Sequence, residues 1–488
     1  MSDKPNDYAF PLQVLEYAAE PVPCIEEWRT LWKAWDLVTN MIPAEALMEQ
    51  PIPLRNPLKF YVGHIPTFED IHLARATGKP LTDPASYAQY FERGIDPDVD
   101  DPSQCHDHSE LPTVWPDLGE MLDYREKVKA RIRSMYETGL AYRDRCVGRA
   151  LWIGYEHEAL HLETFLYMAI LSPNIQPPPG IPRPDFERMA REAASARVEN
   201  EWFRIPDQEL TLGYEDGESD DGPNRFFAWD NEREPYDVLV PSFEAQARPI
   251  CVGEFAAFLV AVGRRDSIPA TWVRTGSGGQ GDDLQAFVSQ HGIRTVWGLI
   301  PLSYAVDWPA MASYNEMSSY CDWLGGGVRI PTLEEVRSIH ELVDRRKPSY
   351  KPSNNSKKNK TTHTDPETIF TDLTGANVGL QNFHPVSVTD RGASLCGLGD
   401  LGADFMDGKH VAITGGSWAL PPRIAGRKTF QNWWQKGYAY PWVTARLVRD
   451  SPSPSRWPGA GFATQRTGKP AHGQFVRLRN SSAGTSLA

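Results

Sequence analysis

Apolar residues recur at helical spacing through the first 200 residues of the chain. Residues 26–41 carry one such stripe, and comparable patterns cover 58–75, 117–138 and the segment around His157. This periodicity is typical of amphipathic helices, so we predict a bundle of four helices. Six prolines within residues 173–184 end the predicted bundle, and a charged helix is expected near 185–199.

From Trp202 onward the pattern changes to short β-rich segments separated by Gly, Pro and Trp. Residues 209–214 and 236–240 predict strands, and 252–262 and 311–324 predict helices. These features indicate an irregular α+β domain. We therefore expect four parts, with boundaries that follow the changes in composition: a flexible N-terminus at 1–20, a helical bundle at 21–200, an α+β domain at 201–450 and a loose tail at 451–488. Residues 347–366 are nearly free of apolar side chains, which predicts a disordered insertion.

Charge and composition exclude several classes of protein. The net charge of −14 over 488 residues argues against a nucleic-acid-binding protein, which needs a basic face. No run approaches the roughly 18 apolar residues of a membrane span, and the first residues lack the apolar core of a signal peptide. The six cysteines are scattered without a Cys-x-x-Cys pair. We therefore expect free thiols and a cytoplasmic location.

The most informative motif is GYEHEALHLE at residues 154–163. On a helix, His157 and His161 lie on one face with Cβ atoms about 5–6 Å apart, a spacing suited to two ligands of one metal ion. As H-E-x-x-H, the motif is typical of zinc proteases with Glu158 as general base. As H-x-x-x-H-x-E, it supplies two ligands of a mononuclear iron site. A third interpretation treats both histidines as ordinary polar helix residues.

A metal site needs a third ligand, and His64 in FYVGHIP (60–66) is the best candidate because a bundle helix could direct it inward. Three imidazoles suit iron, zinc or copper, so ligand type leaves the metal open. The longer metzincin pattern is absent after His161. A zinc protease would instead need Glu187 or Glu192 from the charged helix. The cluster at residues 105–108, Cys-His-Asp-His, is interpreted as a polar loop.

Five separated motifs resemble those of the non-haem iron sulfoxide synthases of ergothioneine biosynthesis, specifically the C-terminal half of the fungal enzymes. In order, they are FYVGHIPTF (60–68), FERGIDPDVD (91–100), the histidine run at 157–163, FAWDNE (227–232) and GGSWALPPRIAGR (415–427). The resemblance covers roughly residues 20–450. It implies a DinB-like helical bundle followed by a C-type-lectin-like domain of the formylglycine-generating-enzyme type, also called the sulfatase-modifying-factor type.

The resemblance also implies a metal site. His64, His157 and His161 match the family's iron ligands, which implies an Fe(II) cofactor. Glu163 matches the acid of the motif, and we expect it to orient a histidine from outside the metal's own ligands. Glu158 then needs no catalytic role and is expected on the helix surface.

Substrate contacts are implied in the same way. Asn432 and Trp433 match an Asn-Trp pair that contacts the histidine-derived substrate, where an aromatic face suits a trimethylammonium group. Trp434 replaces an acidic residue of the bacterial enzymes that use γ-glutamylcysteine, which favours free cysteine as thiol donor. Arg125 lies where the family places carboxylate-binding arginines. Core packing for the tryptophans and a solvated position for Arg125 are the alternatives.

The sequence departs from the family in two places. It shows no methyltransferase domain, so we expect trimethylhistidine to come from a separate methyltransferase, and a lyase to act on the product. In addition, residues 399–401 run almost directly into 402–410. A stretch containing the family's active-site tyrosine is therefore absent near Leu401–Asp404, either truly or through a gene-model error. Tyr438 and Tyr440 are candidates to replace that tyrosine in space.

Three hypotheses about function follow. The first is an iron(II)- and O₂-dependent sulfoxide synthase that forms a C–S bond between cysteine and a histidine betaine (hercynine). The second keeps the iron site but changes the chemistry to a thiol dioxygenase or related thiol-histidine oxidase, because of the absent tyrosine stretch. The third is a non-catalytic ligand-binding paralogue.

Overall fold

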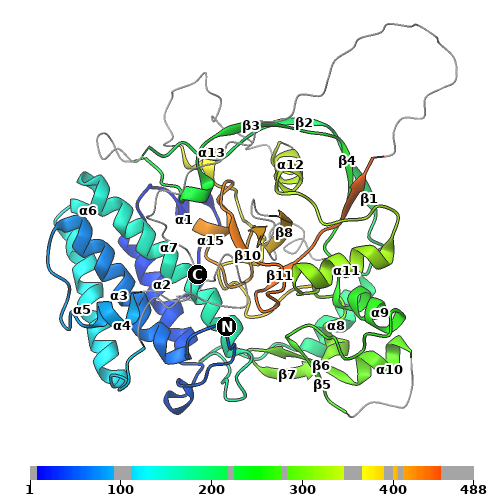
Figure 1. Cartoon of the computed structure of the whole chain (residues 1–488), viewed down its shortest axis with the longest axis horizontal. Helices are drawn as coiled ribbons and strands as arrows, with labels where there is room; N and C mark the ends of the chain where they lie inside the picture. Colours follow the sequence, from blue (N-terminus) through cyan, green and yellow to red (C-terminus); the bar gives the residue numbers. More distant parts are fainter. Residues whose placement is uncertain are drawn as a thin grey trace, which may run out of the picture.

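The computed structural model describes residues 8–92, 111–217, 225–276, 283–345, 365–389, 399–404 and 410–451 of the chain. Up to residue 195 the described part is helical, drawn in blue to cyan in Figure 1. The helices are α1 (Val14–Tyr17), α2 (Ile25–Thr39), η1 (Ala44–Ala46), α3 (Leu58–Thr77), α4 (Tyr87–Phe91), α5 (Leu118–Glu137), α6 (Leu140–Arg143), α7 (Arg145–Ala169) and α8 (Phe186–Ser195).

Four long helices, α2, α3, α5 and α7, pack together as the predicted bundle. Each starts or ends within a few residues of its predicted range, except that α7 begins well before His157. Its start is set by Asp144, whose side chain accepts a hydrogen bond from the backbone N–H of Val147 at 3.2 Å, as is typical of a helix N-cap. Nearly every residue of α7 from Leu151 onward is buried, so this helix is the core of the bundle.

From residue 202 the described chain mixes short strands and helices, as expected. The helices are η2 (Asp230–Glu232), α9 (Val252–Ala261), α10 (Leu284–Ser289), η3 (Leu302–Tyr304), α11 (Tyr314–Leu324), α12 (Leu333–Asp344), α13 (Pro366–Ile369) and α15 (Pro422–Ala425). The strands are β1 (Trp202–Ile205), β2 (Gln208–Leu212), β3 (Tyr236–Val240), β4 (Phe243–Gln246), β5 (Trp272–Arg274), β6 (His291–Thr295), β7 (Gly298–Pro301), β8 (Gly399–Asp404), β9 (His410–Thr414), β10 (Asn432–Gln435), β11 (Val443–Thr444) and β12 (Val448–Asp450).

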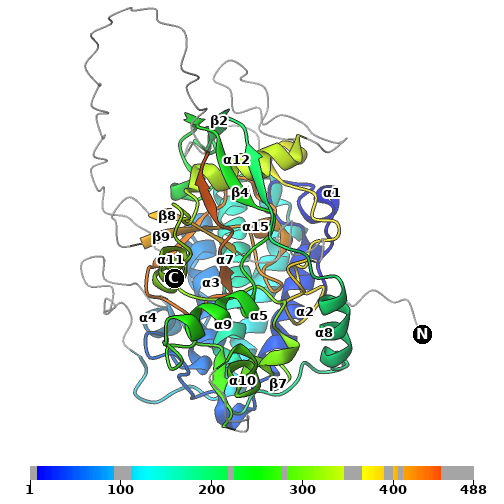
Figure 2. The same ribbon diagram turned by 90° about the vertical axis from the view of Figure 1, so that its right-hand side faces the viewer.

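These strands form small sheets rather than one large one. Within the described residues the strand orders are β1-β4-β12, β10-β9-β8-β11, β2-β3 and β5-β6-β7. All pairings are antiparallel except that of β11 with β8. In Figure 2, turned by 90°, the strands and short helices of this half stand in front of the bundle. Buried residues of both halves join one apolar core, so the second half lies directly against the bundle.

The N-terminal segment differs from the prediction. We expected residues 1–20 to be flexible, but Phe10, Val14 and Tyr17 are buried. The backbone N–H of Phe10 donates to the carbonyl of Gly379 at 3.0 Å, and the Tyr17 hydroxyl donates to that of Thr371 at 2.6 Å. Residues 8–20 are therefore packed in the structure, because their apolar side chains lie against a part of the chain that is far away in sequence.

Several predicted segments fall outside the described residues. These are most of the expected insertion at 347–366, the tail beyond residue 451, the Cys-His-Asp-His cluster at 105–108 and most of the family motif at 91–100. Of the insertion, Asp365 and Pro366 are described, and the Asp365 carboxylate accepts from the backbone N–H of Glu367 at the start of α13. Among the described helices, none combines the length and apolar character needed to cross a lipid bilayer.

Candidate metal centre

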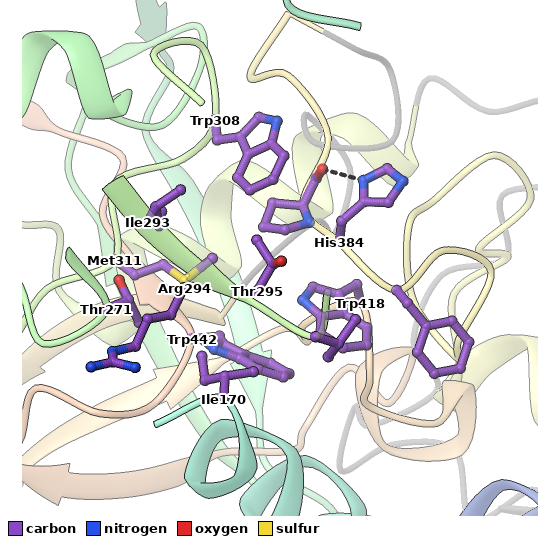
Figure 3. Close-up of a pocket in the computed structure, with 13 residues that line it drawn as sticks. Ile170, Thr271, Ile293, Arg294, Thr295, Trp308, Met311, His384, Trp418 and Trp442 are labelled. Atoms are coloured by element: carbon purple, nitrogen blue, oxygen red, sulfur yellow. Dashed lines mark hydrogen bonds between the residues drawn. The ribbon is translucent and has the colours of Figure 1, made fainter. Parts of the chain in front are cut away.

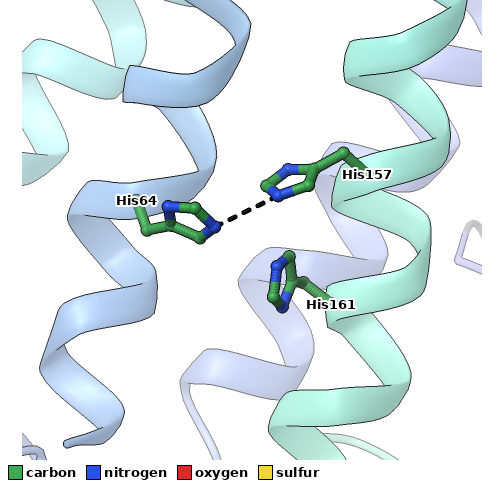
Figure 4. A group of neighbouring side chains, drawn as sticks. All are labelled: His64, His157 and His161. Atoms are coloured by element: carbon green, nitrogen blue, oxygen red, sulfur yellow. Dashed lines mark hydrogen bonds between the residues drawn. The ribbon is translucent and has the colours of Figure 1, made fainter. Parts of the chain in front are cut away.

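The three histidines predicted from the sequence meet inside the bundle. His64 comes from α3, and His157 and His161 come from adjacent turns of α7 (Figure 4). All three are buried, and their potential ligand atoms lie within 4.8 Å of one another. The Nε2 atoms of His64 and His157 are 3.1 Å apart. The structure thus brings together all three predicted ligands.

Neighbouring groups fix the orientation of two imidazoles. His64 Nδ1 lies 2.7 Å from the backbone carbonyl of Phe91, so Nδ1 carries the proton and the Nε2 lone pair faces the other histidines. The ring of His157 stacks on Phe68 with centroids 3.7 Å apart. The Nδ1 atoms of His157 and His161 are buried without a hydrogen-bond partner.

Burial also sets the protonation of these rings. It lowers the pKa of His64 to about 4 and the pKa values of His157 and His161 well below the usual range. The neighbouring imidazoles, and Arg55 in the case of His161, lower these two values further because they disfavour a second positive charge. At neutral pH, three uncharged imidazoles therefore converge. Neutral imidazole is the form that binds metal ions, so the site fits a divalent ion such as Fe(II), Zn(II) or Cu(II).

Among the described residues, Glu163 forms no hydrogen bond to Nδ1 of His157 or His161, so the orienting role that the resemblance implied stays a prediction. Glu163 follows His161 by two positions on α7, so its side chain leaves the helix on a different face. There it accepts a hydrogen bond from Ser417 of the second half, while burial raises the pKa of its carboxyl to about 7. Within the described residues, Glu163 thus connects α7, which we call the ligand helix because it carries His157 and His161, to the Gly-Gly-Ser-Trp motif.

Glu158 and Arg125 are both buried, contrary to the helix-surface and solvated positions considered for them. Arg125 on α5 donates to Glu158 at 3.2 Å and forms an ion pair with Asp36 on α2. This arrangement satisfies both groups within the bundle, because three helices meet there. Arg125 therefore already has two carboxylate partners and Glu158 a cationic one, both inside the bundle.

The remaining zinc-protease candidates lie away from the histidines. Glu187 and Glu192 are on α8, with side chains about 61% and 63% exposed. They pair with Arg191 and Arg188, respectively, one turn away. Neither acid joins the histidine cluster, so the described residues provide no His₂Glu site.

The predicted substrate residues lie on β10, which pairs with β9. The Trp433 ring packs edge-on against His410 with centroids 4.6 Å apart. The Trp434 ring stacks on Tyr438 at 4.9 Å. Asn432 accepts a hydrogen bond from the backbone N–H of Trp433 at 2.8 Å. All three residues on β10 are partly exposed, so the tryptophans are not simply core residues.

Arg55 is a residue that the sequence analysis did not identify. It precedes α3 and is 3% exposed. Its Nε donates to the Tyr438 hydroxyl at 2.8 Å, and its guanidinium carbon lies 4.9 Å from the Trp434 ring centre. The neighbouring Tyr167 hydroxyl lies 3.4 Å from that of Tyr438. No local sequence pattern marks Arg55, because its partners lie hundreds of residues away.

Two arginines of the last family motif hold the second half against the bundle, and we call them the arginine clamp. Arg423 donates to both carboxylate oxygens of Glu27 on α2, at 2.9 and 3.2 Å. Arg427 binds both carboxylate oxygens of Glu156 on α7 and also donates to Glu232 at 2.7 Å. Because Glu156 immediately precedes His157, the clamp fixes the ligand helix.

A separate pocket lies near the C-terminal end of α7. It has about 330 Å³ of empty space, part of it open solvent, and includes Trp308, Trp418 and Trp442 in its lining (Figure 3). His384 also lines it, with Nδ1 2.7 Å from the carbonyl of Pro385. None of the three clustered histidines contributes to this pocket, so it is distinct from the metal centre.

The chain is similar in sequence to known proteins that cover the motifs described above. A sequence model of the DinB superfamily matches residues 26–165, which include all three histidines. Ergothioneine biosynthesis protein 1 of Neurospora crassa is 41% identical over 514 residues, covering 89% of this chain and 58% of that protein. The protein of the same name from Schizosaccharomyces pombe is 29% identical over 489 residues, covering 90% and 57%. The chain thus spans somewhat more than half the length of the curated relatives it matches.

Solved structures give weaker matches. PvdO from Pseudomonas aeruginosa aligns with 51% of this chain and 94% of its own, at 17% identity and a TM-score of 0.30. CarF aligns with 52% of this chain and 99% of its own, at 12% identity and a TM-score of 0.31. TM-scores this low do not establish a common fold. The resemblance in the motifs is confirmed by the sequence relatives: the chain is related over 89% of its length to ergothioneine biosynthesis protein 1 and carries a DinB-superfamily domain at residues 26–165.

Proposed function

We propose that this protein is an Fe(II)- and O₂-dependent sulfoxide synthase that joins cysteine to trimethylhistidine in ergothioneine biosynthesis. One observation carries the proposal: three neutral, buried imidazoles converge in a chain related to ergothioneine biosynthesis protein 1. Residues 201–450 are proposed to form the formylglycine-generating-enzyme-like domain implied by the motif order. A separate methyltransferase would supply trimethylhistidine, a lyase would consume the product, and the cytoplasm is the proposed location.

The proposed reaction balances without another reductant. A C–H bond of the imidazole ring and the S–H bond of cysteine break, and a C–S bond and an S=O bond form. These changes remove four electrons, which reduce O₂, so one oxygen atom enters the sulfoxide and the other leaves as water. Bound iron would supply the redox chemistry, and a three-histidine ligand set leaves positions open for substrates.

The chain's own residues contribute orientation and exclusion of water. The Phe91 carbonyl, 2.7 Å from Nδ1 of His64, keeps the Nε2 lone pair directed at the metal position. Phe68 covers one face of His157. The bond between Arg427 and Glu156 prevents rotation of α7 at the residue before His157. These contacts support a site formed before substrate binds.

The test is a reaction with purified protein loaded with Fe(II) under anaerobic conditions. Trimethylhistidine, cysteine and then O₂ are added, and the products are identified by mass spectrometry. We expect a coupled sulfoxide. We also expect H157Q and H161Q to lose both bound iron and product, whereas H340Q, a substitution on α12, retains them. Cysteine sulfinate alone would instead favour a thiol dioxygenase, and absence of any oxidised product would refute both enzymatic proposals.

A further inference from the structure

Arg55 is a buried cation with unused hydrogen-bonding capacity. Among the described residues its side chain forms no ion pair with a carboxylate, and its Nη1 atom is buried without a hydrogen-bond partner. Other buried arginines here, such as Arg125, Arg423 and Arg427, have carboxylate partners. Arginine keeps its charge when buried, and an unsatisfied buried charge is costly. The position of Arg55 therefore calls for an anion.

Aromatic rings hold the guanidinium in place but do not satisfy it. The rings of Trp434, Tyr438 and Tyr167 have centres 4.9, 5.4 and 5.9 Å from its central carbon. Such rings stabilise a cation, and the Tyr438 hydroxyl accepts from Nε. They leave Nη1 without an acceptor. The surroundings thus orient the guanidinium and leave its Nη1 donor available.

The free donor lies on the His161 side of the metal centre. The Tyr61 ring is 5.4 Å from that of His161, and the charge of Arg55 acts on both Tyr61 and His161. The Tyr61 hydroxyl is buried next to Arg55 and the backbone of Asn56, and no group there accepts its proton in a well-formed hydrogen bond. Two buried polar groups, the Arg55 Nη1 and the Tyr61 hydroxyl, therefore stand next to each other beside the three histidines. A carboxylate can accept from both.

We propose that Arg55 binds the carboxylate of an amino-acid substrate beside the metal centre, with Tyr61 as a second donor. This inference rests on the proposed function and adds the residue that recognises the substrate. It replaces Arg125, whose guanidinium is already paired with Glu158 and Asp36. Cysteine and trimethylhistidine both carry a carboxylate, so either substrate can be the ligand.

The experiment compares ligands that differ only in the carboxylate. Wild-type protein and R55Q, each metal-free and Fe(II)-loaded, are titrated without O₂ by calorimetry. The two pairs are cysteine with cysteamine, and trimethylhistidine with its decarboxylated analogue. We expect R55Q to weaken binding of one carboxylate ligand about 10- to 100-fold, the range for a hydrogen bond to a charged group. Its decarboxylated partner should bind both proteins equally, and the affected pair identifies the substrate.

Controls separate recognition from a structural role. R133Q removes another arginine packed on an indole, 5.1 Å from the Trp32 ring, and should leave all affinities unchanged. R55K keeps the charge and should recover part of the preference for the carboxylate. If R55Q does not fold, the titrations of the wild-type protein still test the proposal. Equal affinity of the wild-type protein for both members of each ligand pair overturns it. Equal weakening of both members by R55Q overturns it too.

Failure of this inference differs from failure of the proposed function. Sulfoxide formation by a protein whose R55Q variant still prefers the carboxylate refutes only the role of Arg55. Carboxylate binding that depends on Arg55, without sulfoxide formation, refutes only the proposed reaction.

Discussion

Substitution of Arg427 by methionine should test the arginine clamp most directly. The change keeps an unbranched side chain of similar length but removes a guanidinium that binds Glu156 twice and Glu232 once. Both carboxylates are fully or almost fully buried. After the substitution Glu156 keeps only the indole N–H groups of Trp152 and Trp229, each at 2.7 Å. Two buried carboxylates then lose their shared cation.

The cost follows from breaking a buried ion pair. Removing one partner typically costs about 3–5 kcal/mol, compared with a total stability of about 5–15 kcal/mol for most proteins. Burial already raises the pKa of Glu156 in the wild-type protein, and loss of Arg427 raises it further. Because the folded variant then holds protons that the unfolded chain releases, its deficit grows as pH rises and shrinks toward pH 5.

The assay is chemical denaturation followed by far-UV circular dichroism at pH 5 and pH 8, together with measurement of bound iron. R29M provides the control, because Arg29 pairs with Glu26 where both side chains are more than half exposed, and such pairs contribute at most about 1 kcal/mol. Adding E156Q to R427M should recover part of the loss by removing one uncompensated charge. A loss for R427M no larger than that for R29M would refute the clamp, as would a deficit independent of pH.

Three further predictions concern packing and protonation. G426A should destabilise the protein, since the added Cβ would lie 2.3 Å from the Tyr17 hydroxyl. The control G119A has open space around its Cβ and should be neutral or stabilising by up to about 1 kcal/mol. Thermal denaturation compares the melting temperatures of the two variants. E163Q should gain stability relative to wild type as pH rises from about 4.5 to about 7, by roughly 1–3 kcal/mol, because burial raises the pKa of the Glu163 carboxyl to about 7. A difference in unfolding free energy that stays constant across this pH range would contradict the raised pKa. The metal-free protein should lose stability as pH falls from about 6.5 to about 4, by about 3 kcal/mol for His64 alone, because the unfolded chain takes up protons first. H64Q should therefore reduce the dependence of unfolding free energy on pH. An unchanged pH dependence would show that His64 is not held neutral.

Local sequence patterns were sufficient to predict the bundle and its three candidate metal ligands. Spacing of three and four residues placed α2, α3, α5 and α7, and the four-residue separation of His157 and His161 put both on one face. His64 needed only an inward-facing position on a second helix. These features follow from helix geometry, which a single segment of sequence contains.

Contacts between distant segments could not be obtained in this way. Arg55 and Tyr438 are 383 positions apart, and Glu163 meets Ser417 across the two halves of the chain. For Arg125 the sequence suggested either a substrate carboxylate or a solvated position, yet its partners are Asp36 and Glu158 from two other helices. Which charges end up paired depends on how helices and sheets pack, and that depends on the whole chain.

The long separation between Glu156 and Arg427 has a consequence for biosynthesis of the protein. The two residues are 271 positions apart, so the counterion of a fully buried acid is synthesised long after α7 itself. Domains generally fold in order as they leave the ribosome, and the nascent bundle would reach that stage with Glu156 uncompensated. Until Arg427 emerges, the acid must stay protonated or reach water. Helix α7 therefore gains its final support only after the second half of the described chain has been synthesised.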